Sequence, residues 1–248
     1  MPMPALGGAE TLDAARRIAA AERILVLTGA GVSAESGVPT FRGPEGLWRQ
    51  YRPEELATPE AFARDPRLVW EWYAWRRGLI APLRPNPAHD ALVRLESRAP
   101  AFLLATQNVD GLHHAAGSRR LVELHGSLWR VRCTACGSER EDRSVPLSEL
   151  PPRCRCGGLL RPGVVWFGES LPEAALQAAF AAGEACELVL VVGTSSVVYP
   201  AAAIAPAARA RGAFVVEVNP DETPLTPLAH ASFRGKAARI LPSLLGAA

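Results

Sequence analysis

Four short runs of almost wholly apolar residues constrain the fold of this chain more than any other feature of its sequence. The runs cover residues 24–27, 102–105, 188–192 and 214–218, and the last of them includes one charged residue, Glu217. A strand that is apolar at every position is buried on both faces, as strands of a parallel sheet are. Helical patterns accompany the runs, at Glu10–Ala21 and at the alanine-rich Ala201–Ala210. Strands that alternate with helices predict an α/β fold with a doubly wound parallel sheet.

Two stretches interrupt this alternation. The first, from Phe41 to Asn86, is rich in Trp, Arg and Pro and predicts short helices outside the sheet. The second, from Gly126 to Pro162, holds four of the five cysteines among many polar residues and prolines. We find no internal repeat, and we expect both stretches to be excursions from the sheet and not tandem domains.

Composition and charge exclude several classes of protein. The 248 residues are 48% apolar and 21% charged, which is ordinary for a soluble globular chain and excludes collagen-like and disordered sequences. No apolar run approaches the roughly 20 residues of a membrane span, and the first ten residues show no secretory signal. A net charge of +2 favours neither a nucleic-acid binder nor an acidic scaffold. We therefore expect a cytoplasmic protein without a membrane or nucleic-acid partner.

A glycine-rich turn, Thr28–Ser33, follows the first apolar run. Gly29 and Gly31 would let the backbone approach a pyrophosphate, but a plain link between a strand and a helix uses similar glycines. Two other runs end in polar turns, at 193–195 and 219–221, and carboxyl ends of parallel strands meet at one sheet edge. This convergence favours a dinucleotide site. No strand with an acidic end follows about 20 positions later, so the dinucleotide would be held differently than in ordinary NAD dehydrogenases.

Polar residues after the remaining run point to the same edge. These residues are Gln107, Asn108 and Asp110, whose polar side chains are costly to bury without hydrogen-bond partners. Asp110 could instead cap the next helix. His125 alternates with apolar residues, which fits either a structural histidine or a general base. The pattern alone leaves these alternatives open. We expect the pair His113-His114 to lie on a helix surface.

The spacing of four cysteines predicts a structural metal site. Cys133-x-x-Cys136 is followed, after seventeen residues, by Cys154-x-Cys156. Four thiolates satisfy tetrahedral zinc and leave no open position for catalysis. Four unconnected thiols are the alternative, and the second pair is more tightly spaced than the usual C-x-x-C. We expect Cys186 to pack in the core.

Taken together, these motifs resemble those of the sirtuins, which are NAD-dependent protein-lysine deacylases. The matching segments are Gly29–Gly43, Gln107–Asp110, Leu124–Gly126, the four cysteines, Val165–Glu169, Gly193–Ser195 and Asn219–Asp221. The resemblance implies a Rossmann-like NAD-binding domain and a small domain made of a helical insertion and a zinc ribbon. The implied bounds are 1–40, 87–125 and 164–248 for the first, 41–86 for the helical insertion and 126–163 for the zinc-binding insertion.

The resemblance also implies an activity. Acyl groups would be removed from protein lysines with NAD as co-substrate, giving nicotinamide and 2′-O-acyl-ADP-ribose. The acyl oxygen would attack the ribose carbon to form an alkylimidate, and His125 would act as general base on a ribose hydroxyl. Asp110 would hold the nicotinamide carboxamide, and Asn108 and Gln107 would order the ribose and a water. Phe41 would shield the reacting centre.

Carried over residue by residue, the resemblance assigns the remaining contacts. The implied catalytic residues are His125 and Asn108. The implied cofactor contacts are Gly29, Ala30, Gly31, Ser33, Ala34, Glu35, Thr40, Phe41, Arg42, Trp48, Gln107, Asn108, Val109, Asp110, Gly193, Thr194, Ser195, Asn219, Pro220, Asp221 and Ala237. The implied substrate contacts are Tyr73, Arg76, Val165, Trp166, Phe167, Gly168 and Glu169. The peptide would pair as a strand between 168–169 and 196–199. One structural zinc per chain and a monomeric state are also implied.

Tyr73 and Arg76 resemble the Tyr-x-x-Arg pair of class III sirtuins of the bacterial type, which prefer succinyl and malonyl groups. An arginine fork pairs bidentately with a carboxylate, and a tyrosine hydroxyl adds a third donor. Residues three apart share a helix face, so both side chains can reach one pocket. Without the resemblance, the pair would be interpreted as part of an aromatic-rich helix surface.

Two other functions fit parts of the pattern. Mono-ADP-ribosyl transfer to protein uses the same NAD binding and nicotinamide release, and a transfer that survived replacement of His125 would favour it. An NAD-sensing regulatory module with contacts through the zinc ribbon is the other alternative. The joint presence of His125, Asn108 and Asp110 argues against a bare sensor.

Overall fold

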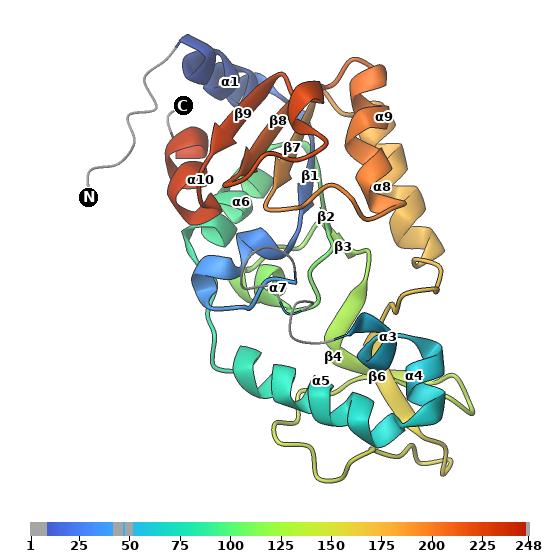
Figure 1. Cartoon of the computed structure of the whole chain (residues 1–248). Coiled ribbons are helices and arrows are strands. Elements are labelled where there is room, and N and C mark those ends of the chain that lie inside the picture. Colours follow the sequence, from blue (N-terminus) through green and yellow to red (C-terminus); the bar gives the residue numbers. More distant parts are fainter. Residues whose placement is uncertain (1–8, 42–46, 48–51, 247–248) are drawn as a thin grey trace.

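The chain is described by a computed structural model over residues 9–41, 47 and 52–246 (Figure 1). Within these residues, a parallel six-stranded sheet has the order β3-β2-β1-β7-β8-β9. Its strands are β1 (Arg23–Thr28), β2 (Ala101–Thr106), β3 (Leu121–Glu123), β7 (Leu188–Val192), β8 (Phe214–Asn219) and β9 (Ala231–Arg234). The strand order reverses between β1 and β7, and such a switch point is where open α/β sheets bind ligands.

Helices cover both faces of this sheet (Figure 1). One face carries α1 (Ala9–Ala20), α6 (Pro87–Arg98) and α10 (Ala237–Gly246), and the other carries α8 (Glu173–Ala185) and α9 (Ile204–Ala210). Along β1, Val26 faces the first layer, whereas Leu25 and Leu27 face the second. Both faces are buried, which is why the central strands β1, β2, β7 and β8 are apolar at most positions. The predicted doubly wound, Rossmann-like sheet is therefore confirmed.

The four predicted strands match β1, β2, β7 and β8 to within one residue at each end. The two edge strands β3 and β9 were not predicted, because they are short and carry polar side chains. The alanine-rich segment begins as a 3₁₀ helix, η3 (Ala201–Ala203), before it continues as α9. Two further short elements at the sheet are α7 (Leu112–Ala116) and the 3₁₀ helix η4 (Thr226–Leu228).

The two interruptions pack together beside the sheet, at the bottom of Figure 1. The first forms α3 (Pro53–Leu56), α4 (Pro59–Arg64) and α5 (Pro66–Ile80). The second forms an antiparallel sheet of order β5-β4-β6, from β4 (Gly126–Cys133), β5 (Glu139–Glu141) and β6 (Leu160–Val164). The prediction of short helices fits α3 and α4 but is wrong for α5, which runs for 15 residues. Asp65 caps the start of α5, and Pro66 is its first residue.

Buried polar side chains connect these two interruptions. The Trp70 indole on α5 donates to the carbonyl of Leu160 on β6 at 2.7 Å, and Arg77 Nε donates to the carbonyl of Leu128 on β4 at 2.8 Å. Arg77 also pairs with Asp142 at 3.5 Å. None of the helices in the described ranges combines the length and apolar character of a membrane span.

Candidate nucleotide and acyl-lysine site

The glycine turn after β1 touches the loop after β7. The Gly31 N–H donates to the carbonyl of Gly193 at 2.8 Å, and the Gly29 N–H donates to that of Val192 at 3.1 Å. A Cβ on Gly31 would lie 2.7 Å from the Gly193 Cα, and Gly193 itself has φ +61°. These glycines therefore allow two loops to cross at the switch point of the sheet. The turn continues as two short 3₁₀ helices, η1 (Ala30–Val32) and η2 (Ala34–Ser36).

Side chains from three strand ends meet at Thr194, in the loop after β7. The Gln107 amide, after β2, donates to the Thr194 hydroxyl at 3.0 Å. The Asn219 amide, at the end of β8, donates to the Thr194 carbonyl at 2.7 Å. The Gln107 N–H in turn donates to the Thr28 carbonyl at 2.9 Å. The structure thus brings together the polar turns that the sequence placed at one sheet edge.

Asn108 and Asp110 converge on Ser33 in the glycine turn. The Asn108 amide donates to the Ser33 hydroxyl at 3.2 Å, and this hydroxyl also bonds the Asp110 carboxylate. Asp110 accepts the N–H of Leu112, the first residue of α7, at 2.8 Å, although the N-cap residue of this helix is Gly111 and not Asp110. Burial raises the pKa of Asp110, and these hydrogen bonds only partly oppose the rise. The amide and the carboxyl group are therefore fixed and shielded from water.

His125 lies just beyond β3, with its ring held by the chain. Its Nδ1 lies 3.1 Å from the Gln107 carbonyl oxygen. Since a carbonyl only accepts, Nδ1 carries the proton and Nε2 is the basic nitrogen. Burial lowers the pKa of His125, and the bond to Gln107 partly offsets this. A neutral imidazole with its basic nitrogen fixed in this way is suited to general-base chemistry.

The prediction that His113 lies on a helix surface is wrong. Its side chain is buried, its Nε2 lies 3.0 Å from the Thr28 hydroxyl, and its ring packs on His89 at 4.8 Å between centroids. His89 was missed by the sequence analysis. It completes a capping box with Asn86 at the start of α6 and lies 3.4 Å from the Ser33 hydroxyl. An Asn-Pro pair followed by a histidine at the third helical position was the available signal.

Tyr73 and Arg76 lie side by side on α5 and are both buried. The Arg76 guanidinium lies 4.7 Å from the centre of the Phe41 ring and 4.9 Å from that of Trp72. Burial lowers the pKa of Arg76, with Tyr73 and Asp110 acting in the opposite direction. Burial also raises the pKa of Tyr73 to about 12, so its hydroxyl keeps its proton. A hollow beside Arg76 is lined by Val38, Pro39, Leu47, Trp75, Leu79 and Ile80.

The loop of residues 165–169 is tied both to His125 and to α5. The Val165 N–H donates to the His125 carbonyl at 2.9 Å. The Trp166 indole donates to the Tyr73 hydroxyl at 2.9 Å, which leaves the tyrosine proton free to donate elsewhere. Arg161 and Glu169 form a bidentate pair at 2.6 and 2.8 Å, with Arg161 over the Trp166 ring. The next side chain, Phe167, is exposed.

The remaining predicted site residues differ in their surroundings. The Glu35 carboxylate accepts the Ala238 N–H at 2.9 Å, next to Ala237 at the start of α10, so it has a structural partner. Asp221 lies exposed beyond β8. Arg42 and Trp48 fall outside the described residues. The other predicted contacts lie in the loops already described: Ala30, Ala34, Thr40, Val109, Gly168, Ser195 and Pro220.

The four clustered cysteines fit a zinc ion. Their Sγ atoms all lie within 4.8 Å of one another. Two of the separations are 3.5 Å, for Cys133 and Cys156, and 3.9 Å, for Cys136 and Cys154. Tetrahedral zinc with bonds of about 2.3 Å needs sulfur atoms about 3.8 Å apart. The donor set is closed, so the site suits a structural ion.

Comparisons with known proteins agree with this geometry. The sequence profile of the Sir2 family matches residues 29–200. A protein of Aquifex aeolicus named NAD-dependent protein deacylase is 59% identical over 86% of this chain and 90% of its own length. A solved Sir2 homologue in complex with NAD is 51% identical, covers 95% of this chain and 93% of its own, and has a TM-score of 0.90. A mutant Sir2 homologue with 2′-O-acetyl ADP ribose is 52% identical, with 95% of each chain covered and a TM-score of 0.90. This chain therefore belongs to the Sir2 family, the sirtuins.

Proposed function

We propose that this chain is an NAD-dependent protein-lysine deacylase, which transfers the acyl group of a modified lysine to ADP-ribose and releases nicotinamide. One observation carries the proposal. His125, Asn108 and Asp110 are buried or half-buried at the sheet edge that also bears the glycine turn and Thr194. The relative from Aquifex aeolicus bears the corresponding name, and related structures contain NAD or acetyl-ADP-ribose.

Each of these residues has a separate role in the proposal. NAD supplies the ribose carbon that accepts the acyl oxygen, and nicotinamide leaves from it. Asp110, fixed by the Leu112 N–H and the Ser33 hydroxyl, holds the nicotinamide carboxamide. Asn108, fixed by Ser33, orders the ribose and its attacking oxygen. Nε2 of His125 takes the proton of a ribose hydroxyl. Phe41, under the Arg76 guanidinium, shields the reacting centre from water.

The wider organisation follows from the same proposal. Residues 1–40, 87–125 and 164–248 form the NAD-binding domain, and 41–86 with 126–163 form the small domain. Cys133, Cys136, Cys154 and Cys156 hold one zinc ion that stabilises the small domain. A thiolate site of this kind favours a reducing compartment such as the cytoplasm. The enzyme acts as a monomer on acyl-lysine peptides that lie as a strand between residues 168–169 and 196–199.

Tyr73 and Arg76 support a preference for acyl groups that carry a carboxylate. Arg76 is buried yet stacked on aromatic rings, and Tyr73 keeps a proton to donate because its oxygen accepts from Trp166. A buried guanidinium gains most from an anionic partner. Succinyl and malonyl groups provide such a partner, whereas acetyl does not.

The first experiment incubates the protein with NAD and a succinyl-lysine peptide and follows the peptide and the nucleotide by mass spectrometry. We expect loss of the acyl group and formation of acyl-ADP-ribose, and we expect His125→Ala to abolish both without lowering the melting temperature. No loss of succinyl or acetyl groups would contradict the proposal. ADP-ribosylated protein formed equally well by His125→Ala would favour ADP-ribosyl transfer instead.

The second experiment tests the acyl preference. Arg76→Met should reduce kcat/KM for the succinyl peptide by about 10²-fold or more, because a bidentate charged pair is lost, while the acetyl peptide is affected less. Arg67→Met, on the exposed side of the same helix, is the matched control. Equal losses for both peptides would assign Arg76 a structural role.

A further inference from the structure

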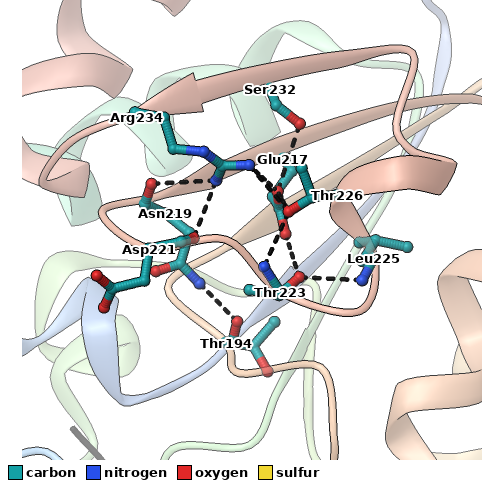
Figure 2. Close-up of polar contacts among 9 residues, drawn as sticks. All are labelled: Thr194, Glu217, Asn219, Asp221, Thr223, Leu225, Thr226, Ser232 and Arg234. Atoms are coloured by element: carbon teal, nitrogen blue, oxygen red, sulfur yellow. Dashed lines mark hydrogen bonds and ion pairs between the residues drawn. The ribbon is translucent and has the colours of Figure 1, made fainter.

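A buried carboxylate on β8 has no part in the proposed chemistry. Glu217 is 1% exposed and lies on the same side of β8 as Val215, which packs in the layer of α8 and α9. Figure 2 shows the hydroxyl groups of Thr223, Thr226 and Ser232 turned toward it. The guanidinium of Arg234, at the end of β9, pairs with it at 3.0 Å. One carboxylate is thus surrounded by four donor groups, which offsets the cost of burying its charge.

Arg234 uses the rest of its guanidinium on the loop that follows β8. Its Nη1 donates to the carbonyl of Asp221 at 3.0 Å and to that of Asn219 at 3.4 Å (Figure 2). Its Nη2 bonds Glu217 and the Thr226 hydroxyl. A planar fork can serve a carboxylate and two carbonyl oxygens at once, which a lysine ammonium on one flexible stem cannot do. Glu217 therefore holds the guanidinium, and the guanidinium holds the backbone of residues 219–221.

The loop held in this way continues into the proposed nucleotide site. The Asn219 side chain donates to the Thr194 carbonyl, and the Thr194 hydroxyl accepts from Gln107. A dinucleotide with its pyrophosphate at the switch point between β1 and β7 extends in two directions along the sheet edge. His125, beyond β3, lies on one side of β1, and residues 219–221, beyond β8, lie on the other. If the nicotinamide end lies near His125, the adenosine end lies near residues 219–221.

We propose that Arg234, held by Glu217, is a positioning residue for the adenosine end of NAD. This inference rests on the proposed function. Arg234 touches no part of the nucleotide in this scheme; it fixes the carbonyls of Asn219 and Asp221, so that the side chains of this loop are already arranged when the adenosine ribose arrives. Loss of Arg234 weakens nucleotide binding and leaves the chemical step, at the far side of β1, unchanged.

The test uses the whole protein with zinc bound. Binding of ADP-ribose is measured by titration calorimetry, and kcat and KM for NAD are measured with one acyl-lysine peptide. We expect Arg234→Met to raise both the Kd of ADP-ribose and the KM of NAD about tenfold, the effect of losing one to two hydrogen bonds to charge. The value of kcat at saturating NAD and the KM of the peptide should stay within about twofold.

Two variants sharpen the test. Arg234→Lys keeps the charge beside Glu217 and loses the fork, so it should fold and still weaken ADP-ribose binding. Arg23→Met is the matched control, because Arg23 pairs with Glu187 at 2.8 Å at the opposite, amino-terminal end of the same sheet. It should leave the Kd of ADP-ribose unchanged.

The outcomes separate this inference from the proposed function. If the unmodified protein fails to bind ADP-ribose, the proposed function itself is wrong. If it binds, but both Arg234 variants bind as tightly, the positioning role is wrong. A fall in kcat equal to the rise in the KM of NAD, or a Kd change matched by Arg23→Met, would also overturn the inference, because a merely structural role predicts those results.

Discussion

The molecule has two regions that are stabilised in different ways. The large region is the six-stranded sheet with its covering helices, and the small region is the β4–β6 sheet with α3–α5. The core of the large region is almost wholly aliphatic and lies on both sides of continuous parallel strands. The core of the small region is rich in aromatic side chains, including Trp70, Trp129 and Trp166, and its second interruption carries the four thiols. Hydrogen bonds between neighbouring parallel strands stabilise the large region. The small region depends on a few side-chain anchors, such as Trp70 and Arg77, which bond to distant backbone carbonyls, and on metal.

This difference predicts where a single substitution should lower stability most. In the large region, each apolar residue of a strand adds a similar increment to one extended core. In the small region, the Arg77 and Trp70 side chains each bridge from α5 to the carbonyl of a strand residue, Leu128 on β4 or Leu160 on β6. Removal of one anchor should therefore destabilise the small region more than removal of one exposed ion pair in either region.

Removal of zinc should have the largest effect, and it should lower the stability of the small region much more than that of the large region. Structural zinc contributes about 10 kcal/mol or more to small zinc-bound folds, because the bare thiols cannot hold their loops together. We expect a chelator, or Cys154→Ser, to abolish hydrogen-exchange protection of β4 and β6 while β1 and β7 stay protected. Unchanged protection of β4 and β6 in protein shown by metal analysis to lack zinc would contradict this.

Arg77→Met should have the second-largest effect on the free energy of unfolding. Arg77 is 1% exposed, and its loss takes the Nε donor from the Leu128 carbonyl and leaves Asp142 with Arg140 and the Ser144 N–H. Breaking a buried ion pair costs about 3–5 kcal/mol, and this pair lies toward the lower end because Arg140 also reaches Asp142. Urea unfolding followed by tryptophan fluorescence measures the change. If Arg77→Met proves as stable as Arg67→Met, the anchor explanation is wrong.

Acid should weaken the large region through its buried histidines. Burial lowers the pKa of His89 to about 4, and that of His113 falls well below its usual value. The unfolded chain, with a histidine pKa near 6.5, binds protons first as the pH falls. Stability is therefore complete above about pH 6.5 and is lost toward pH 4, by about 3 kcal/mol for His89 alone. Unfolding free energies between pH 7 and 4.5 should show this slope, reduced in His89→Gln; an identical slope in that variant would refute the assignment.

Exposed ion pairs should have the smallest effect, and an equal one in both regions. Arg17 pairs with Asp13 on α1, and Arg67 pairs with Glu71 on α5, each at 2.9 Å. Both pairs are exposed and local, but Arg17 also lies over the Phe214 ring at 4.6 Å, so the carboxylates are the residues to change. Asp13→Ala and Glu71→Ala should each cost less than about 0.5 kcal/mol in urea unfolding. A marked loss at only one of them would show that the two regions differ at their surfaces as well as in their cores.

The candidate site was predictable where a single chain segment carries its signal. The glycine turn, the polar strand ends, His125 and the four cysteines are each local patterns, and parallel strands necessarily bring their carboxyl ends to one edge. The contact between His89 and His113 was not predictable, although the Asn86-Pro87 pair gave a signal for His89 as a capping residue, because the two rings come from α6 and α7 and meet only in the packed structure.

The sequence by itself determined the α/β class, the four central strands and the metal-binding set, because periodicity and spacing are properties of neighbouring residues. Only the tertiary structure decided that the glycines serve a loop crossing at Gly193, that edge strands β3 and β9 complete the sheet, and that Glu217 and Arg234 meet behind the loop of residues 219–221. These features depend on which residues come into contact after distant segments pack, and no local sequence pattern predicts the free energy of such contacts.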